Sequence, residues 1–303
     1  MDAQSASRTA LAVALMRARH VRLDPNPLLD DAWGDRLVPD SVREAIRNRA
    51  LSGMSARERE RAEASPESIV DEYLRNLAAY GNVILRSRFA EDALATAVLR
   101  GVRQYVLVGA GFDSFALRRP PFAHEVTVYE VDHPATQGLK LRRLAECGVA
   151  APPSTNFVAA DLGKEDLASA LSRTLFRSDE LTFFSWLGVS MYLTRDANQA
   201  ALRAIARCGT PGSELVFTYL DQAVFEPSSE SKGFEALRNT VASVSEPFVS
   251  GFDPRTLREE LGEVGLELVQ DLDGPELVRF YDSAGINRLE STSASHIAVA
   301  RVG

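Results

Sequence analysis

The chain has 303 residues, of which 45% are hydrophobic and 25% charged, so it can bury one large core with an appendage. Its formal net charge of −8 argues against a nucleic-acid partner, and no apolar run is long enough to predict a membrane span or a membrane partner. Two cysteines (Cys147 and Cys208) and four scattered histidines make neither a disulfide framework nor a metal-ligand cluster, which predicts a cytoplasmic protein without a metal site.

The first 100 residues predict helices and no strand. Apolar residues recur at helical spacing over three segments, residues 41–51, 55–64 and 66–100. Plausible N-caps stand at Ser41, Ser55 and Ser65, and we expect the third helix to bend or break near Gly81. The short apolar stretch 10–16 lies between arginines, which favours an amphipathic helix over a signal peptide.

Beyond residue 100, strand-like apolar runs alternate with helical segments. The runs occupy residues 105–109, 126–131, 156–160, 181–187 and 213–219, and the helical segments occupy residues 134–147, 164–175 and 195–208. This alternation predicts a parallel sheet with helices on both faces. The last elements are expected at residues 254–262 (helix), 265–271 (strand) and 296–302 (strand). Residues 275–289 show no clear helix, and the pattern alone predicts five or six strands in no defined order.

Residues 221–252 form a long insertion after the fifth predicted strand. Their length and their mixture of serine, glutamate and phenylalanine are typical of a binding lid, with a solvated helical excursion as the alternative. Together with the N-terminal helices, this insertion is expected to close over the bound ligand and exclude water.

The most informative stretch is a glycine turn after the first predicted strand. The apolar run breaks into Gly109-Ala110-Gly111, and the next run ends at Asp132, 23 residues after Gly109. Glycines let the backbone approach a ligand closely, and a carboxylate at about this spacing can accept hydrogen bonds from both hydroxyls of a ribose. Ser114 stands at the third glycine position of the dinucleotide fingerprint, which argues against NAD and favours a nucleoside cofactor without phosphates.

Five motifs in order resemble the S-adenosylmethionine-dependent methyltransferases related to leucine carboxyl methyltransferase, a group that includes bacterial O-methyltransferases of secondary metabolism. The motifs are Ser7–Ala10 with Asn26–Asp31, Arg103–Arg118, Val128–Pro134, Asp161–Leu162 and Phe183–Thr194. The resemblance implies an α/β fold with a doubly wound, mostly parallel sheet of seven strands, the last inserted antiparallel. It also implies S-adenosyl-L-methionine as the cofactor, bound by a domain at residues 101–303 beneath a helical cap at residues 1–100.

The resemblance places the first motifs against the cofactor. Gly109, Ala110 and Gly111 would approach it through their backbone, with a plain tight turn as the alternative. Asp132 would accept hydrogen bonds from the ribose. The alternative for Asp132 is a helix N-cap, because the His133-Pro134 pair suits the start of a helix.

The later motifs and one arginine complete the implied cofactor site. Asp161 would bind the adenine amino group and Leu162 would supply a backbone amide and an apolar wall, with a cap for the following helix as the alternative. An arginine near this place in the family binds the cofactor carboxylate, for which a forked guanidinium is suited. Arg86 is preferred for this role, Arg88 competes with it, and either could be a solvated helix charge.

The fourth motif departs from the family pattern. Many relatives carry a glutamate before its glycine, and this chain has Leu187 before Gly188. A carboxylate that could touch the cofactor or the acceptor is therefore missing. Trp186 and Leu187 are expected beside the cofactor, and Trp186 could equally belong to the core.

Methyl transfer displaces a sulfonium that is already activated, so the protein mainly positions the acceptor and excludes water. A carboxylate acceptor needs no base, whereas a hydroxyl benefits from one. His133 is a candidate base, although a structural role is the alternative. Tyr192 and Tyr219 are further candidates near predicted strand ends, and Asp221 follows the second of them.

The sequence therefore predicts an enzyme that uses S-adenosyl-L-methionine to methylate a carboxylate or hydroxyl of a small apolar metabolite. The first alternative, suggested by Leu187, is a relative that binds the cofactor but catalyses a rearrangement or cyclisation. The second alternative, a nicotinamide-dependent reductase, is disfavoured by Ser114. The sequence predicts neither the identity of the acceptor nor the oligomeric state.

Overall fold

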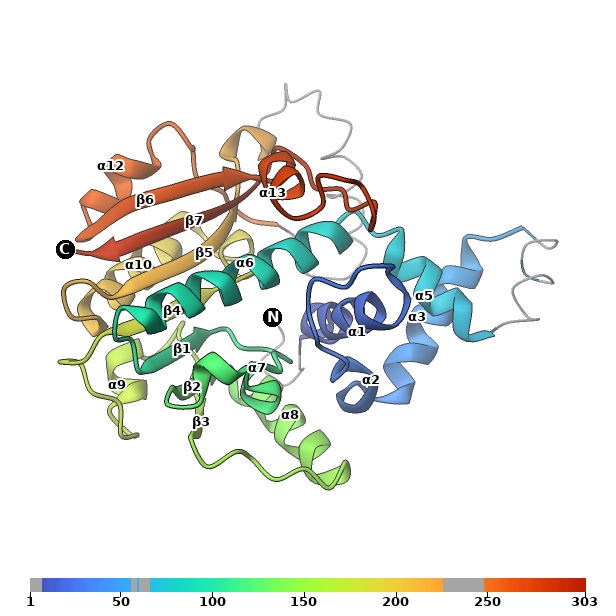
Figure 1. Ribbon diagram of the computed structural model, residues 1–303, viewed down its shortest axis with the longest axis horizontal. Helices are drawn as coiled ribbons and strands as arrows, with labels where there is room; N and C mark the ends of the chain where they lie inside the picture. Colours follow the sequence, from blue (N-terminus) through green and yellow to red (C-terminus); the bar gives the residue numbers. More distant parts are fainter. Residues whose placement is uncertain (1–6, 56–58, 60–65, 226–247) are drawn as a thin grey trace.

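Seven strands form one sheet in the order β3-β2-β1-β4-β5-β7-β6 in the computed structural model, which describes residues 7–55, 59, 66–225 and 248–303 (Figure 1). The strands are β1 (Gln104–Val108), β2 (Thr127–Asp132), β3 (Thr155–Ala159), β4 (Thr182–Trp186), β5 (Glu214–Leu220), β6 (Leu266–Asp273) and β7 (Ser295–Val302). β7 runs antiparallel to both of its neighbours, and the other pairs are parallel. The expected doubly wound sheet of seven strands is confirmed.

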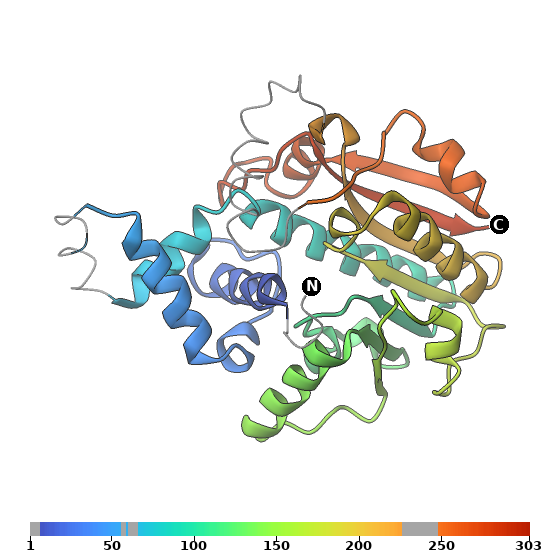
Figure 2. The same cartoon turned by 180° about the vertical axis from the view of Figure 1, so that it is seen from behind.

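The sheet separates two hydrophobic cores. Tyr105 and Leu107 of β1 belong to one core, and Val106 and Val108 belong to the other, because successive side chains of a strand point to opposite faces. Helix α6 (Tyr80–Leu99) covers the first face (Figure 1), and α10 (Arg195–Cys208) lies on the second (Figure 2). Burial on both faces explains why the central strands are apolar at nearly every position.

The N-terminal helices gather at the end of the sheet toward which β6 points (Figure 1). They are α1 (Arg8–Leu23), α2 (Gly34–Leu37), α3 (Asp40–Ser52) and α5 (Pro66–Arg75). The helix expected over residues 66–100 is broken between α5 and α6, just before Gly81, as predicted. A Cβ at Gly81 would lie 2.0 Å from the backbone oxygen of Glu290, so only glycine permits this approach.

Two expected N-caps and one expected helix in this region need correction or lie outside the described residues. Ser41 is inside α3, whose N-cap is Pro39. The segment expected as a helix at 55–64 falls almost entirely outside the described residues, and so does its neighbour Ser65.

The second half carries α7 (Phe115–Arg118), α8 (Pro134–Glu146), α9 (Leu167–Leu171), α12 (Leu257–Gly262) and α13 (Gly274–Tyr281) in addition to α10. The expectation of no helix in residues 275–289 is wrong, because α13 occupies the first half of that stretch. Asp273 caps it in a capping box with Glu276. Helix α9 is shorter than the predicted 164–175, because a turn precedes its N-cap, Asp166.

Most of the predicted lid, residues 226–247, lies outside the described residues. Its described ends contact each other and the loop after β4. Asp221 pairs with Phe252 in an isolated bridge, and the Val249 amide donates to the carbonyl oxygen of Met191 at 2.7 Å. Within the described part of the chain, no helix combines the length and apolar character needed to cross a membrane.

Candidate active site

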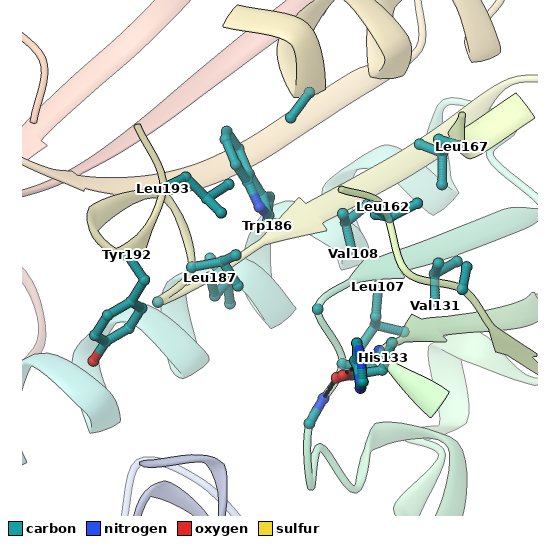
Figure 3. Close-up of a pocket in the computed structure, with 18 of the residues that line it drawn as sticks. Leu107, Val108, Val131, His133, Leu162, Leu167, Trp186, Leu187, Tyr192 and Leu193 are labelled. Atoms are coloured by element: carbon teal, nitrogen blue, oxygen red, sulfur yellow. Dashed lines mark hydrogen bonds between the residues drawn. The ribbon is translucent and has the colours of Figure 1, made fainter. Parts of the chain in front are cut away.

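A cavity of about 890 Å³ opens at the carboxyl ends of β1, β2, β3 and β4, between α1 and α10. Ligands of open α/β sheets bind at this edge, and the volume lies near the upper end of the range for small-molecule sites. Figure 3 shows Tyr192 on one side of the cavity and Leu162 and His133 on the other. The cavity is thus long enough to bring separate groups from the motifs to one ligand.

The glycine turn allows two close approaches. Gly109 and Gly111 have φ angles of 73° and 54°, in the left-handed region that side chains disfavour. A Cβ at Gly109 would lie 2.6 Å from Val189 of the loop after β4, and one at Gly111 would lie 3.0 Å from the Cβ of Ala10 in α1. Ala110 lines the cavity between them. The turn after β1 therefore packs directly against α1 and against the loop after β4, and all three line the cavity.

Asp132 ends β2 and faces the glycine turn. Its Oδ2 accepts a hydrogen bond from the Gly111 amide, and its Oδ1 accepts one from the His133 amide at 2.6 Å. Burial raises the pKa of Asp132, while these two backbone amides and the charge of Lys140 act in the opposite direction. A carboxylate oxygen has further acceptor capacity beyond one amide, so Asp132 can also accept from a ligand hydroxyl.

His133, and not Asp132, is the N-cap of α8. Its Nδ1 accepts a hydrogen bond from the Ala135 amide at 3.3 Å, and its Nε2 lies 3.9 Å from Oδ2 of Asp161. An Nδ1 that accepts cannot carry the proton of a neutral ring, so the proton is on Nε2 and faces a carboxylate. His133 lines the cavity, but in this arrangement neither ring nitrogen offers a free lone pair for a base.

Asp161 and Leu162 follow β3 and line the cavity. Oδ2 of Asp161 lies 2.7 Å from Nζ of Lys164, and this hydrogen bond lowers the pKa of the carboxyl. Oδ1 accepts from the Gly163 amide at 3.1 Å, so Asp161 shapes a turn and does not cap α9. Leu162 exposes 37% of its surface at the cavity wall, an apolar face open to a ligand.

Trp186 and Leu187 leave β4 at the middle of the cavity (Figure 3). Trp186 is buried, with its ring centre 6.1 Å from that of Phe217, so it belongs to the core and to the cavity wall together. Leu187 packs against the core on the α6 side of the sheet. Leu187 therefore contributes an apolar surface to the cavity.

Of the two candidate arginines, the structure places only Arg86 at the cavity. Its guanidinium lies against Gly188 and makes a long hydrogen bond of 3.4 Å to Oδ1 of Asn82. Burial lowers the pKa of Arg86 to about 10. In the part of the chain that the structure describes, no carboxylate pairs with it. Arg88 instead forms a 3.0 Å ion pair with Asp92.

The two candidate tyrosines differ in the same way. Tyr192 lines the cavity, with its ring centre 5.6 Å from that of Phe248. Tyr219 does not line it: its hydroxyl donates to Oδ2 of Asp271 at 2.7 Å and its ring stacks on His296 at 4.8 Å. The prediction that Tyr219 contacts the reacting groups is therefore not supported by its position.

Residues of α1 that were not assigned from the sequence also form the wall. Thr9, Ala10 and Arg17 line the cavity. The buried Arg17 donates to Oδ2 of Asp31 at 2.7 Å and to the carbonyl oxygen of Phe112 at 2.8 Å. The N-terminal motif of the resemblance was the signal for this contact, because it contains both Thr9 and Asp31.

A seven-stranded sheet with one antiparallel strand, a glycine turn after β1 and a carboxylate at the end of β2 place the protein among the α/β folds that bind a nucleotide-like cofactor at this edge. The sequence profile of leucine carboxyl methyltransferase matches residues 10–206, and the chain belongs to this family. It is 30% identical over 297 residues to the S-adenosyl-L-methionine-dependent methyltransferase YktD of Bacillus subtilis, covering 97% of this chain and 96% of that protein. A methyltransferase of the same designation from Mycobacterium marinum is 30% identical over 244 residues, covering 79% of this chain and 71% of the relative.

Solved structures share the fold. A DUF574 family protein from Streptomyces avermitilis superimposes with a TM-score of 0.56 and 17% identity over 85% of this chain and 96% of that one. A methyltransferase structure from Thermobifida fusca gives a TM-score of 0.52 at 14% identity, over 77% of this chain and 88% of the other. Membership of the family excludes the nicotinamide-dependent alternative and confirms S-adenosyl-L-methionine as the cofactor.

Proposed function

We propose that the enzyme transfers the methyl group to an oxygen of a small, mostly apolar metabolite, with a carboxylate as the favoured acceptor and a hydroxyl as the other. The single observation that carries the proposal is the hydrogen bonding of the His133 ring. Among the described residues it is the only histidine that lines the cavity, and its Nδ1 is engaged by the Ala135 amide. A carboxylate acceptor is already anionic and needs no base, which suits such a site.

The residues of the cavity fit the cofactor. Gly109, Ala110 and Gly111 line the cavity with their backbone, and Asp132 has acceptor capacity for the ribose hydroxyls. Asp161 and Leu162 would hold the adenine. Arg86, a half-buried cation at the cavity without a carboxylate partner among the described residues, would hold the carboxylate of the methionine part. When bound, the cofactor supplies a methyl group already activated on a sulfonium.

The remaining part of the cavity suits a compact acceptor. Tyr192 lies at the end away from Leu162 and His133 (Figure 3), and the α1 residues Thr9 and Val13 also line the cavity. Leu187 adds an apolar surface where many relatives carry a glutamate. These walls favour an apolar body with one polar group, and the helices of residues 1–100 would enclose it as a cap. A cytoplasmic role in secondary metabolism is part of the same proposal.

The test is a product screen with S-adenosyl-L-methionine that carries a deuterated methyl group. Small apolar carboxylic acids and hydroxylated metabolites are incubated with the enzyme, and products are identified by mass. We expect a labelled ester that mild alkali cleaves with release of labelled methanol. An alkali-stable labelled ether identifies a hydroxyl acceptor. A methyl on nitrogen or carbon contradicts the proposal, and a product of unchanged mass supports the rearrangement alternative suggested by Leu187.

A further inference from the structure

An ion pair is buried directly behind the glycine turn. Nζ of Lys140 in α8 bonds to Oε2 of Glu130 in β2, and their side chains are 1% and 2% exposed. Its second acceptor is the carbonyl oxygen of Asp113, at 2.5 Å. Lys140 therefore ties α8 and β2 to the backbone of the turn that follows β1.

Asp113 belongs to the same turn as Gly111. Its amide donates to the carbonyl oxygen of Ala110 at 2.9 Å, and its Oδ1 accepts from the Phe115 amide at 2.8 Å. Its carbonyl is thus a fixed point of the turn, and Lys140 holds it from outside the cavity.

The same face of β2 holds the turn at a second point. Glu130 and Asp132 are two residues apart, so their side chains project from one face of the strand. Asp132 accepts the Gly111 amide directly, and Glu130 reaches the Asp113 carbonyl through Lys140. The turn from Gly111 to Asp113 is therefore fixed to β2 at both ends.

A buried ion pair is a weak source of stability, because removing two charges from water offsets much of their attraction. The cost is visible here. Oε1 of Glu130 is buried without a hydrogen-bond partner, and burial raises the pKa of Glu130 to about 7 despite the neighbouring Lys140. Two apolar side chains would fill this space without that cost, so the pair calls for a role other than stability.

The charge of Lys140 also acts on Asp132. Burial raises the pKa of Asp132, and Lys140 and His133 are the side chains whose charge opposes that rise. The negative charges of Asp113, from the turn, and of Asp132 add to the effect of burial and raise the pKa of Glu130. Lys140 is the fully buried cation of the group.

We propose that Lys140 is a positioning residue of the cofactor site: it fixes the Asp113 carbonyl of the glycine turn and balances the charge of Asp132, so that the carboxylate meets the ribose hydroxyls ionised and in place. The proposal rests on the placement of the ribose at Asp132 under Proposed function. Glu130 serves to hold the Lys140 ammonium, and neither side chain lines the cavity.

The test compares four variants by titration calorimetry with S-adenosylhomocysteine from pH 5 to 9. Lys140→Met removes the charge and keeps the length of the side chain, whereas Glu130→Gln keeps the lysine charge. Tyr129→Phe is the control, since Tyr129 lies on the opposite face of β2, where its hydroxyl donates to Gln104. Asp132→Ala tests the placement of the ribose independently.

Lys140→Met should weaken binding at least tenfold at pH 7 and raise the pH midpoint of binding by about one unit or more, because Asp132 loses its cation. Glu130→Gln should leave that midpoint unchanged or lower it. Amides 110–114 of Lys140→Met should also exchange hydrogen faster without any ligand, unlike those of Tyr129→Phe.

Two results overturn the proposal. In the first, Lys140→Met binds as wild type and with the same midpoint. In the second, Glu130→Gln raises the midpoint as Lys140→Met does. If Lys140→Met does not fold, Glu130→Gln still decides the sign of the effect. If Asp132→Ala binds as tightly as wild type, the ribose placement is wrong. That failure is distinguishable from a failure of the role of Lys140, because the hydrogen exchange of amides 110–114 in Lys140→Met is measured without ligand.

Discussion

Gly188 and Arg86 are packed so closely that a side chain at residue 188 would displace the guanidinium from its present position. A Cβ there would lie 2.5 Å from Nη2 of Arg86, and Gly188 has a φ of 70°. The glycine in the loop after β4 thus leaves the space that the cation occupies at the cavity, although the two residues come from different elements.

Gly188→Ala should therefore displace Arg86 and weaken cofactor binding at least tenfold, in addition to about 1–2 kcal/mol of lost stability from the left-handed backbone. Calorimetry with S-adenosylhomocysteine and urea unfolding measure the two effects. Gly265→Ala is the matched control, because its φ is 84° and nothing lies within 4 Å of the added Cβ. It should lose similar stability and no affinity; equal affinity losses in both variants would disprove a specific effect on Arg86.

Asp132→Ala should weaken cofactor binding by on the order of 1–3 kcal/mol, through lost hydrogen bonds to the ribose. Ligand binding should raise the melting temperature of the wild type more than that of the variant. The pKa of Asp132 is raised by burial, so wild-type affinity should fall as the pH drops through that raised pKa and the carboxylate is protonated. Asp166→Ala, at the rim of the cavity, should keep the affinity. Unchanged binding by Asp132→Ala would show that the carboxylate only orders the turn.

Asp31→Asn should destabilise the protein by about 3–5 kcal/mol, because it leaves the buried Arg17 without its counter-ion. Burial opposes the charge of Asp31, yet Arg17 and Arg118 together hold its pKa below the ordinary 3.8. A lowered folded pKa stabilises the fold above the unfolded value, and this contribution is lost as the pH falls through the lowered pKa. Urea unfolding from pH 7 down to pH 2 should show that loss in wild type and not in the variant. A parallel decline in both would assign the acid sensitivity to other carboxyls.

Tyr192→Phe should lower turnover, whereas Tyr219→Phe should lower stability. Tyr219→Phe removes a hydrogen bond to Asp271 away from the cavity, so about 1 kcal/mol of stability should be lost with turnover unchanged. Tyr192→Phe alters the cavity wall beside Arg86, so turnover should fall with little change in stability. Turnover is measured with the acceptor found in the screen, and the stability of each variant is measured by unfolding. A turnover defect confined to Tyr219→Phe would mean that the cavity end is misassigned.

His133→Asn should retain turnover and keep the same pH profile of kcat, because asparagine can cap α8 and the proposed function does not use His133 as a base. The profile is measured from pH 6 to 9. The loss of a limb near neutral pH together with a large fall in kcat would establish His133 as the base and favour a hydroxyl acceptor.

The sequence by itself determined the sheet and the main cofactor motifs. Apolar runs without polar alternation predict the central strands, which are buried on both faces. All seven strands lie within a few residues of their predicted positions, although the pattern alone predicted five or six strands and no order. The sequence also predicted the glycine turn and Asp132, because short-range geometry governs a turn between a strand and a helix. The sequence analysis did not predict helix α13, although its capping box at Asp273 and Glu276 is a local signal. The helix has only 8 residues after its N-cap, which is too short to show a clear helical periodicity.

Only the tertiary structure decided which polar side chains reach the cavity. Arg86 and Arg88 are two residues apart, about 200° around the helix, so the packing of α6 on the sheet turns one to the cavity and the other to Asp92. Tyr219 is held by Asp271 and His296 of two other strands, and Lys140 meets the glycine turn from a different element. These contacts join residues far apart in the chain, so no local pattern of sequence can specify them.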